Sequence, residues 1–200
     1  MTDEQKTIYA LGLSIAQSIS QFDLSPAELD VLKQAVTDGN SGKPALELST
    51  WGPKIQGFAQ ERSQRLAERE KAVSADYLAK VAGEAGVVKT DSGLLYKEIV
   101  PGTGPSPKAT DTVKVNYRGT LVNGKEFDSS YARNEPAQFA LNRVIPCWTE
   151  GVQKMKVGGK SRLVCPAQIA YGERGQPGIP GGAALTFEIE LLEIPGGSGQ

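Results

Sequence analysis

The spacing of apolar residues changes from a helical period to an alternating one near Gly86, and this change constrains the fold more than any other feature of the sequence. Residues 1–85 hold few glycines and many Ala, Gln, Glu, Leu and Lys residues, which favour helix. Residues 86–200 are rich in Gly, Pro, Val and Thr, which favour strands and turns. The sequence therefore predicts an α+β protein, in which an all-α domain precedes a domain built on a sheet.

Three helices are predicted in the first part. The first covers about residues 3–20 and carries one stripe of apolar residues at three- and four-residue intervals. The second begins with a capping box formed by Ser25 and Glu28 and ends at Gly39. The third is expected over 53–83 and would be about 45 Å long at 1.5 Å per residue. Its middle is almost entirely polar, which predicts an exposed stalk.

The two short helices form a small unit that buries little surface by itself. A second copy of the chain would cover their apolar stripes, so we expect a homodimer that forms through residues 1–60. The alternative is that these helices pack on the C-terminal domain of the same chain. The expected organisation is a helical dimerisation domain over 1–52, a long linker helix over 53–85 and a further domain over 86–200.

Alternating apolar residues after Gly86 predict an antiparallel sheet. The Asn123-Gly124 pair is a strong signal for a hairpin turn. A short amphipathic helix is expected over 149–155. The expected strands lie near 94–99, 113–117, 121–122, 126–127, 139–141, 161–165 and 185–194. An antiparallel sheet wrapped on one short helix is the simplest arrangement of these elements.

The composition limits the kinds of site that the chain can build. It contains no histidine, so the commonest general base and the commonest zinc ligand are both missing. Cys147 and Cys165 are far apart in the sequence and lack metal-ligand spacing. We therefore expect neither a metal nor a cofactor. The net charge of −1 also gives no reason to expect non-specific binding of nucleic acid.

The sequence gives no sign of membrane insertion. No apolar run is long enough to cross a bilayer, and no basic region precedes the segment from Ile8 to Ile19, as it would in a signal peptide. We expect no transmembrane segment. The expected location is the periplasm or cell envelope if an export signal has been removed, and the cytoplasm otherwise.

Five segments resemble, in order and spacing, the FKBP family of peptidyl-prolyl cis-trans isomerases. They are VNYRGTLVNGKEFDSS at 115–130, VIPCW at 144–148, EGVQKMKVGGKSRLVCP at 150–166, AYGERGQPGIP at 170–180 and LTFEIELLEI at 185–194. The resemblance covers about 94–194. The helical part with its long third helix resembles the Mip/FkpA group of bacterial FKBPs, in which the N-terminal domain dimerises and the stalk holds the catalytic domains apart.

The resemblance implies a site for a proline residue and the bond that precedes it. Trp148 would form the floor and Tyr117 an aromatic wall, while the Ile145 amide and the Tyr171 hydroxyl would hydrogen-bond substrate carbonyls. Asp128 would face the twisting carbonyl and help to fix Tyr117. The implied catalytic residues are Tyr117, Asp128, Tyr171 and Phe187, and the implied substrate-binding residues are Phe127, Val144, Ile145, Trp148 and Ile179.

Pattern alone favours other roles for several of these residues. Tyr117, Phe127 and Phe187 fit core aromatic residues equally well, Asp128 fits a turn, and Tyr171 fits a loop anchor. The resemblance predicts an isomerase that acts on proline-containing unfolded or partly folded polypeptides, with chaperone activity and possible binding of macrolide inhibitors. The alternative function is a dimeric chaperone or binding module with little catalysis.

The sequence departs from the family pattern at several positions. Cys147 stands where the family usually has glycine or another small residue, Ala137 replaces an aromatic residue found in many relatives, and Gly181-Gly182 replace a more usual proline-containing stretch. Two interpretations of Cys147 and Cys165 remain open. They are small buried apolar residues, or they form a disulfide, which needs α-carbons within about 7 Å and an oxidising compartment.

Overall fold

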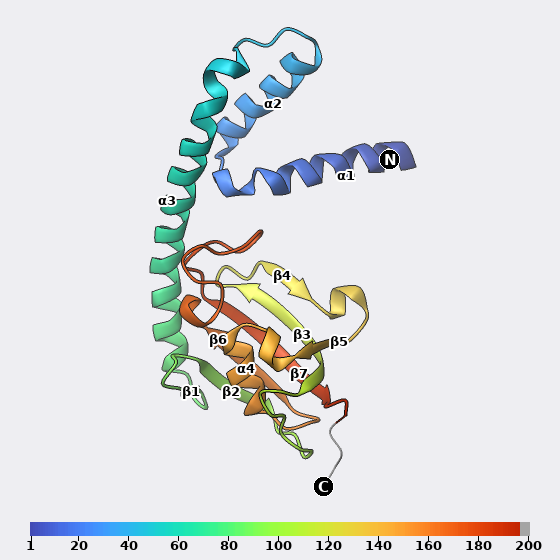
Figure 1. The fold of residues 1–200 in the computed structure, drawn as a ribbon, viewed down its shortest axis with the longest axis vertical. Coiled ribbons are helices and arrows are strands. Elements are labelled where there is room, and N and C mark those ends of the chain that lie inside the picture. The colour runs from blue at the N-terminus through green and yellow to red at the C-terminus, as the bar shows by residue number, and fades with distance from the viewer. Residues whose placement is uncertain (197–200) are drawn as a thin grey trace. The chain divides into compact units, whose positions relative to one another are not determined.

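The structure is a computed structural model that describes residues 1–196 (Figure 1). The chain divides into two units, Met1–Leu66 and Ala67–Gln200. Helix α3 (Leu48–Ala82) crosses this division, so its first part belongs to the helical unit and its second part to the unit that contains the sheet. No helix among the described residues is both long enough and apolar enough to span a membrane.

The first unit contains α1 (Asp3–Ser18), the 3₁₀ helix η1 (Ser20–Phe22), α2 (Pro26–Asn40) and the first part of α3. The predicted capping box of Ser25 and Glu28 is confirmed, and Thr2 forms a second one with Gln5 at the start of α1. Neither α1 nor α2 has a buried residue. The apolar side chains of α1 are exposed in the single chain, whereas in α2 Val31 and Val36 are exposed and Leu29 and Leu32 are half-buried.

Helix α3 begins five residues before the predicted position. Pro53, which was expected to start it, lies inside the helix. A proline has no N–H to donate, so it removes the hydrogen bond to the carbonyl four residues earlier, that of Ser49. The bonds of the rest of the 35-residue helix outweigh that loss. The prediction placed too much weight on the preference of proline for the first turn.

The second unit is built on a seven-stranded sheet in which every strand pair is antiparallel. The strand order is β1-β2-β6-β7-β3-β4, and β5 also pairs with β3. The strands are β1 (Val88–Lys89), β2 (Leu95–Val100), β3 (Thr112–Leu121), β4 (Glu126–Ser129), β5 (Ala137–Ala140), β6 (Lys160–Cys165) and β7 (Leu185–Glu193). Helix α4 (Pro146–Gln153) and the 3₁₀ helices η2 (Tyr131–Arg133), η3 (Leu141–Arg143) and η4 (Ala167–Ile169) lie between strands. The predicted α+β class is thus confirmed.

The two faces of the sheet are covered by different helices (Figure 1). Trp148 and Val152 of α4 belong to the large core on one face, together with Leu163 of β6. The neighbouring residue Val164 points to the other face, since side chains alternate along a strand. There it packs with Val81 of α3 in a second, smaller core. The second part of α3 is therefore a structural part of the sheet unit.

A disulfide joins Cys147 in α4 to Cys165 at the end of β6. The α-carbons are 5.8 Å apart, and both residues are fully buried. Of the two interpretations left open by the sequence, the structure contains the disulfide. It ties α4 to the strand on which that helix packs.

Candidate functional site

Five aromatic rings meet between α4 and the sheet, and we call them the aromatic site. Its members are Tyr117, Phe127, Phe139, Trp148 and Phe187. The Trp148 ring lies at the centre, with ring centroids 5.2 Å from Tyr117, 5.4 Å from Phe139 and 5.3 Å from Phe187. All three contacts are edge-to-face, the geometry that aromatic quadrupoles favour. The site is therefore a closely packed apolar cluster in which the rings hold one another in fixed orientations.

Local sequence explains how these rings come together. Tyr117 lies on β3 and Phe187 on β7, and the two strands pair with each other, so side chains on the same face meet α4. Gly119 provides the space for the rings beside it. A Cβ at this position would lie 2.7 Å from Phe127 Cζ and 3.0 Å from Phe187 Cε1. A larger residue at 119 would push these rings apart.

A polar group borders the aromatic site. The Tyr117 hydroxyl donates a short hydrogen bond to the Asp128 carboxylate. Arg133 donates to the other Asp128 oxygen at 2.6 Å and to the Tyr117 hydroxyl at 2.9 Å. Its guanidinium carbon also lies 5.6 Å from the centre of the Tyr117 ring. Arg133 thus holds Tyr117 and Asp128 in one arrangement.

The pKa values of Tyr117 and Asp128 are shifted away from neutral pH, so the charges of both side chains stay fixed near pH 7. Burial raises the pKa of Tyr117 to about 12, and its hydrogen bond to Asp128 acts in the same direction. Burial also raises the pKa of Asp128, but hydrogen bonds from Tyr117 and Arg133 outweigh that effect and leave it below the ordinary value. Tyr117 is therefore neutral and Asp128 ionised at physiological pH.

Ser130 fixes the backbone of Tyr117. The Tyr117 N–H donates to Ser130 Oγ at 2.9 Å, and the Ser130 N–H donates to the Tyr117 carbonyl at 3.0 Å. Asp128 itself lies in β4, opposite Gly119 of β3, rather than in a turn. Ser130 therefore anchors the end of β4 to β3 beside Tyr117.

Ile145 and Tyr171 offer hydrogen-bond donors at this site. Ile145 precedes the first turn of α4, and its carbonyl accepts from the Trp148 N–H at 2.9 Å. Within residues 1–196 neither the Ile145 N–H nor the Tyr171 hydroxyl has a hydrogen-bond acceptor. The indole Nε1 of Trp148 is buried and also lacks one among the described residues. The first two donors are therefore available to a bound molecule.

The structure brings the residues implied by the resemblance into one cluster. Tyr117, Trp148, Ile179 and Phe187 are buried members of the main core, and Phe127, Val144, Ile145 and Tyr171 pack against it. Asp128 joins them through Tyr117. Sequence reasoning missed Arg133 and the contact of Phe139 with Trp148. Phe139 could have been included because it lies in an expected strand. Arg133 could not, because it follows Asp128 by five residues in a region without clear periodicity.

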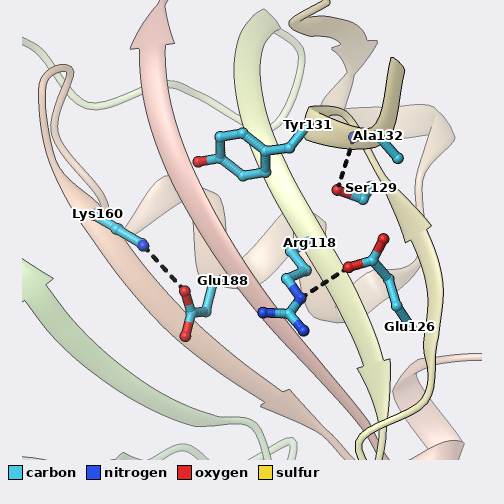
Figure 2. Close-up of a pocket in the computed structure, with 7 residues that line it drawn as sticks. All are labelled: Arg118, Glu126, Ser129, Tyr131, Ala132, Lys160 and Glu188. Carbon is cyan, nitrogen blue, oxygen red and sulfur yellow. Dashed lines mark hydrogen bonds and ion pairs between the residues drawn. The ribbon is translucent and has the colours of Figure 1, made fainter. Parts of the chain in front are cut away.

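A separate groove lies on the opposite face of the sheet (Figure 2). It has a volume of about 410 Å³ and is lined by Arg118, Glu126, Ser129, Tyr131, Ala132, Lys160 and Glu188. Its charges are paired, Arg118 with Glu126 at 2.9 Å and Lys160 with Glu188 at 3.0 Å. Arg118 and Glu188 alternate with Tyr117 and Phe187, so this groove is not part of the aromatic site.

Family models match both parts of the chain. The model described as "FKBP-type peptidyl-prolyl cis-trans isomerase" matches residues 104–192. The model described as "Domain amino terminal to FKBP-type peptidyl-prolyl isomerase" matches residues 4–97. The two matches together extend over most of the chain and follow the order of its helical and sheet-containing parts.

Similar proteins match most of the chain or a large part of it. The FkpA isomerase of Escherichia coli is 40% identical over 205 residues, which cover 96% of this chain and 76% of that protein. The 22 kDa FKBP-type isomerase of the same organism is 38% identical, with 96% of each chain covered. The crystal structure of Escherichia coli FkpA matches with a TM-score of 0.72 at 39% identity and covers 96% of this chain and 97% of that one. An isomerase structure from Pseudomonas syringae matches 64% of this chain and 94% of its own with a TM-score of 0.60 at 39% identity.

Proposed function

The chain belongs to the FKBP-type peptidyl-prolyl cis-trans isomerases, and on that premise we propose that the aromatic site is where it rotates the bond before proline in unfolded or partly folded polypeptides. The observation that carries this assignment is the buried Trp148 ring, framed by three edge-to-face aromatic rings and bordered by two unpaired donors. Proline would pack on Trp148. The residues around Trp148 would then either orient the substrate or enclose the proline ring.

Rotation about a peptide bond needs little chemistry from the enzyme. The uncatalysed barrier is about 18–20 kcal/mol because the planar amide is stabilised by resonance. At the twisted transition state that resonance is lost, and the carbonyl oxygen carries less charge than in the ground state. An apolar surface therefore disfavours the planar amide more than the twisted one, and only such differential binding accelerates the reaction.

The polar groups orient the substrate. The Ile145 N–H and the Tyr171 hydroxyl would donate to carbonyls on either side of the rotating bond and hold the flanking chain still. Asp128 would face the rotating carbonyl, kept in place by Tyr117 and Arg133. Phe127, Val144, Ile179 and Phe187 would enclose the proline ring and the residue next to it. No proton is transferred in this scheme.

The test is a rate measurement with the full chain. Wild-type protein should accelerate cis-trans isomerisation of a short X–Pro peptide, and Tyr171→Phe should lower kcat/KM while the far-ultraviolet spectrum stays unchanged. Tyr131→Phe, on the opposite face, is the matched control and should have no effect. A folded wild-type protein that is inactive on X–Pro peptides would refute the assignment and leave a binding module.

The first unit supports a homodimer with chaperone activity. Its groove of about 550 Å³ is lined mainly by apolar residues, Leu24, Glu28, Val31, Leu32, Ala35, Val36 and Phe58. Along α1, Ile8 and Leu11 are each 62% exposed. Large apolar surfaces of this kind usually mark an interface. Two sites in one dimer would also retain a long client chain better than one.

The disulfide supports an oxidising location. Cytosolic thiols are kept reduced, so a structural bond such as Cys147–Cys165 persists in the periplasm or outside the cell. We therefore place the protein in the periplasm.

Macrolide binding is part of the same proposal, because an apolar ring system would occupy the surface of Trp148. A macrolide should then compete with X–Pro peptides.

A further inference from the structure

Helix α3 lies directly against the 171–184 segment, which runs from Tyr171 through Ile179 to Ala184. The Ala184 N–H donates a hydrogen bond to Ser74 Oγ at 2.7 Å. Ser74 is 4% exposed, and Ser74 and Val81 are the buried residues of α3. A serine hydroxyl buried within a long helix is therefore used to hold the end of this segment.

Two glycines let the segment approach the helix. Gly182 has a φ of +73°, and a Cβ there would lie 3.0 Å from the Ala67 carbonyl oxygen and 3.2 Å from Lys71 Cβ. A Cβ on Gly181 would lie 3.3 Å from Ala67 Cβ and 2.0 Å from the Glu173 carbonyl oxygen. These are the glycines that depart from the family pattern. Glycine fits these positions because the segment lies close to Ala67 and Lys71 of α3 on one side and to its own residue Glu173 on the other.

The contact extends toward the proposed site through backbone hydrogen bonds. The Gly182 N–H donates to the carbonyl of Gly172, the residue after Tyr171, at 3.0 Å. Gln176 and Ile179 exchange two backbone hydrogen bonds of 2.9 and 2.8 Å. A shift of residues 181–184 would therefore reach Tyr171 through its neighbour Gly172, and it would reach Ile179 along the chain, because Ile179 precedes Gly181 by two residues.

We propose that Ala67 and Ser74 of α3 are positioning residues for the isomerase site, because they set the placement of Tyr171 and Ile179 through the 171–184 segment. Lys71 adds an exposed ion pair to Glu173 at 3.3 Å, which contributes little by itself. The proposal rests on the proposed roles of Tyr171 and Ile179. It gives the face of α3 that carries Ala67 and Ser74 a positioning role for the isomerase site.

The test compares two identical substitutions on one helix, made in the full chain. Ala67→Leu adds bulk where the helix meets Gly181 and Gly182, whereas Ala72→Leu adds the same bulk at an exposed position. Ala67→Leu should lower kcat/KM on an X–Pro peptide on the order of tenfold, since small misplacements of a positioning group are costly. Ala72→Leu should leave it unchanged.

A second measurement separates positioning from general destabilisation. In the Tyr171→Phe background, Ala67→Leu should have a smaller effect on kcat/KM, because the group that it displaces is already missing. The NMR signal of the Tyr171 ring, assigned by its loss in Tyr171→Phe, should shift in Ala67→Leu and stay in place in Ala72→Leu. Additive effects together with an unshifted ring signal would overturn the proposal.

Ser74→Ala covers the case in which Ala67→Leu does not fold. It removes the acceptor for the Ala184 N–H without adding volume, and it should lower kcat/KM and shift the Tyr171 signal in the same direction. Wild-type rates in a folded Ser74→Ala or Ala67→Leu protein would contradict the positioning role and leave the proposed function intact. An inactive wild-type protein would instead remove the proposed function itself.

Discussion

Arg133 lies 2.6 Å from the Asp128 carboxylate and joins it to the Tyr117 hydroxyl, although the three residues come from η2, β4 and β3. In the proposed scheme Asp128 would face the rotating carbonyl, so the orientation of its carboxylate would affect the rate. A guanidinium holds its donors in a rigid planar fork, whereas the three N–H donors of an ammonium rotate freely. Arg133 thus helps to keep Tyr117 and Asp128 in a fixed arrangement at the edge of the site.

We predict that Arg133→Leu lowers kcat/KM several-fold, and that Arg133→Lys lowers it less. Loss of the guanidinium also raises the pKa of Asp128, so the acid side of the pH profile should move to higher pH. Steady-state rates over a pH series measure both effects. Arg118→Leu is the control, because it breaks an ion pair with Glu126 on the opposite face. An unchanged pH profile in Arg133→Leu would contradict the positioning role.

The rate should not vary with pH across the neutral range. Asp128 has a lowered pKa and Tyr117 a pKa of about 12, so neither changes its charge between about pH 5 and 9. The contribution of Asp128 to stability is complete above its unfolded pKa and is lost as pH falls through the folded value. That of Tyr117 is complete below its unfolded pKa and is lost as pH rises toward 12. A bell-shaped profile centred near pH 7 would exclude this scheme.

Trp148→Ala should cost both stability and activity. Trp148 is 4% exposed and contacts three other rings, and truncation of a large buried aromatic residue costs about 3–5 kcal/mol. Chemical denaturation measures the first effect, and the X–Pro peptide assay under folded conditions measures the second. Trp51→Ala is the control, since that ring is 48% exposed in the other unit. Equal losses of stability for the two substitutions would count against a buried role for Trp148.

Reduction of the Cys147–Cys165 disulfide should lower stability by about 3 kcal/mol, the chain-entropy value for a loop closed by a bond with a sequence separation of 18. The double variant Cys147→Ala/Cys165→Ala should lose a similar amount, and a reducing agent should not affect it further. Thiol titration of the denatured, unreduced wild-type protein should find no free thiol. Two free thiols in protein purified from an oxidising compartment would refute the bond.

Light scattering should give a mass twice that of the 21.3 kDa chain. Cleavage between Arg62 and Leu66, on the N-terminal side of Ala67, should release a monomeric sheet unit that still contains Ala67 and Ser74. The released unit should keep its activity on short peptides but refold long chains less well, because two linked sites no longer share one client. Val31→Glu in the apolar groove should also weaken the dimer. A monomeric full-length protein would end this proposal.

The sequence predicted elements whose signals are local. The capping box at Ser25 and the turn at Asn123-Gly124 are where they were expected, and Gly124 has the positive φ that such a turn requires. Helix α4 was expected from Thr149 and begins at Pro146, because proline suits the first helical turn. Strand β1 has two residues, too few for any alternation to show.

Features that depend on distant contacts were not predictable from pattern. Residues 60–71 suggested a solvated stalk, but Ser74 and Val81, a little further on, are buried against the sheet unit. Nothing in the local sequence marks Ser74 as buried, since its partner Ala184 lies 110 residues away. The site residues were assigned by resemblance. Their physical pattern alone did not separate them from an ordinary core.

The position of β7 has a consequence for how the chain is made. Among the strands of the described residues this one comes last along the chain, yet it lies between β6 and β3 inside the sheet. Until the ribosome has released residues 185–193, the two neighbours of β7 have open edges that can pair with other chains. The sheet unit therefore closes only after all of residues 88–193 have been synthesised, and its open strand edges are exposed to aggregation until β7 is in place.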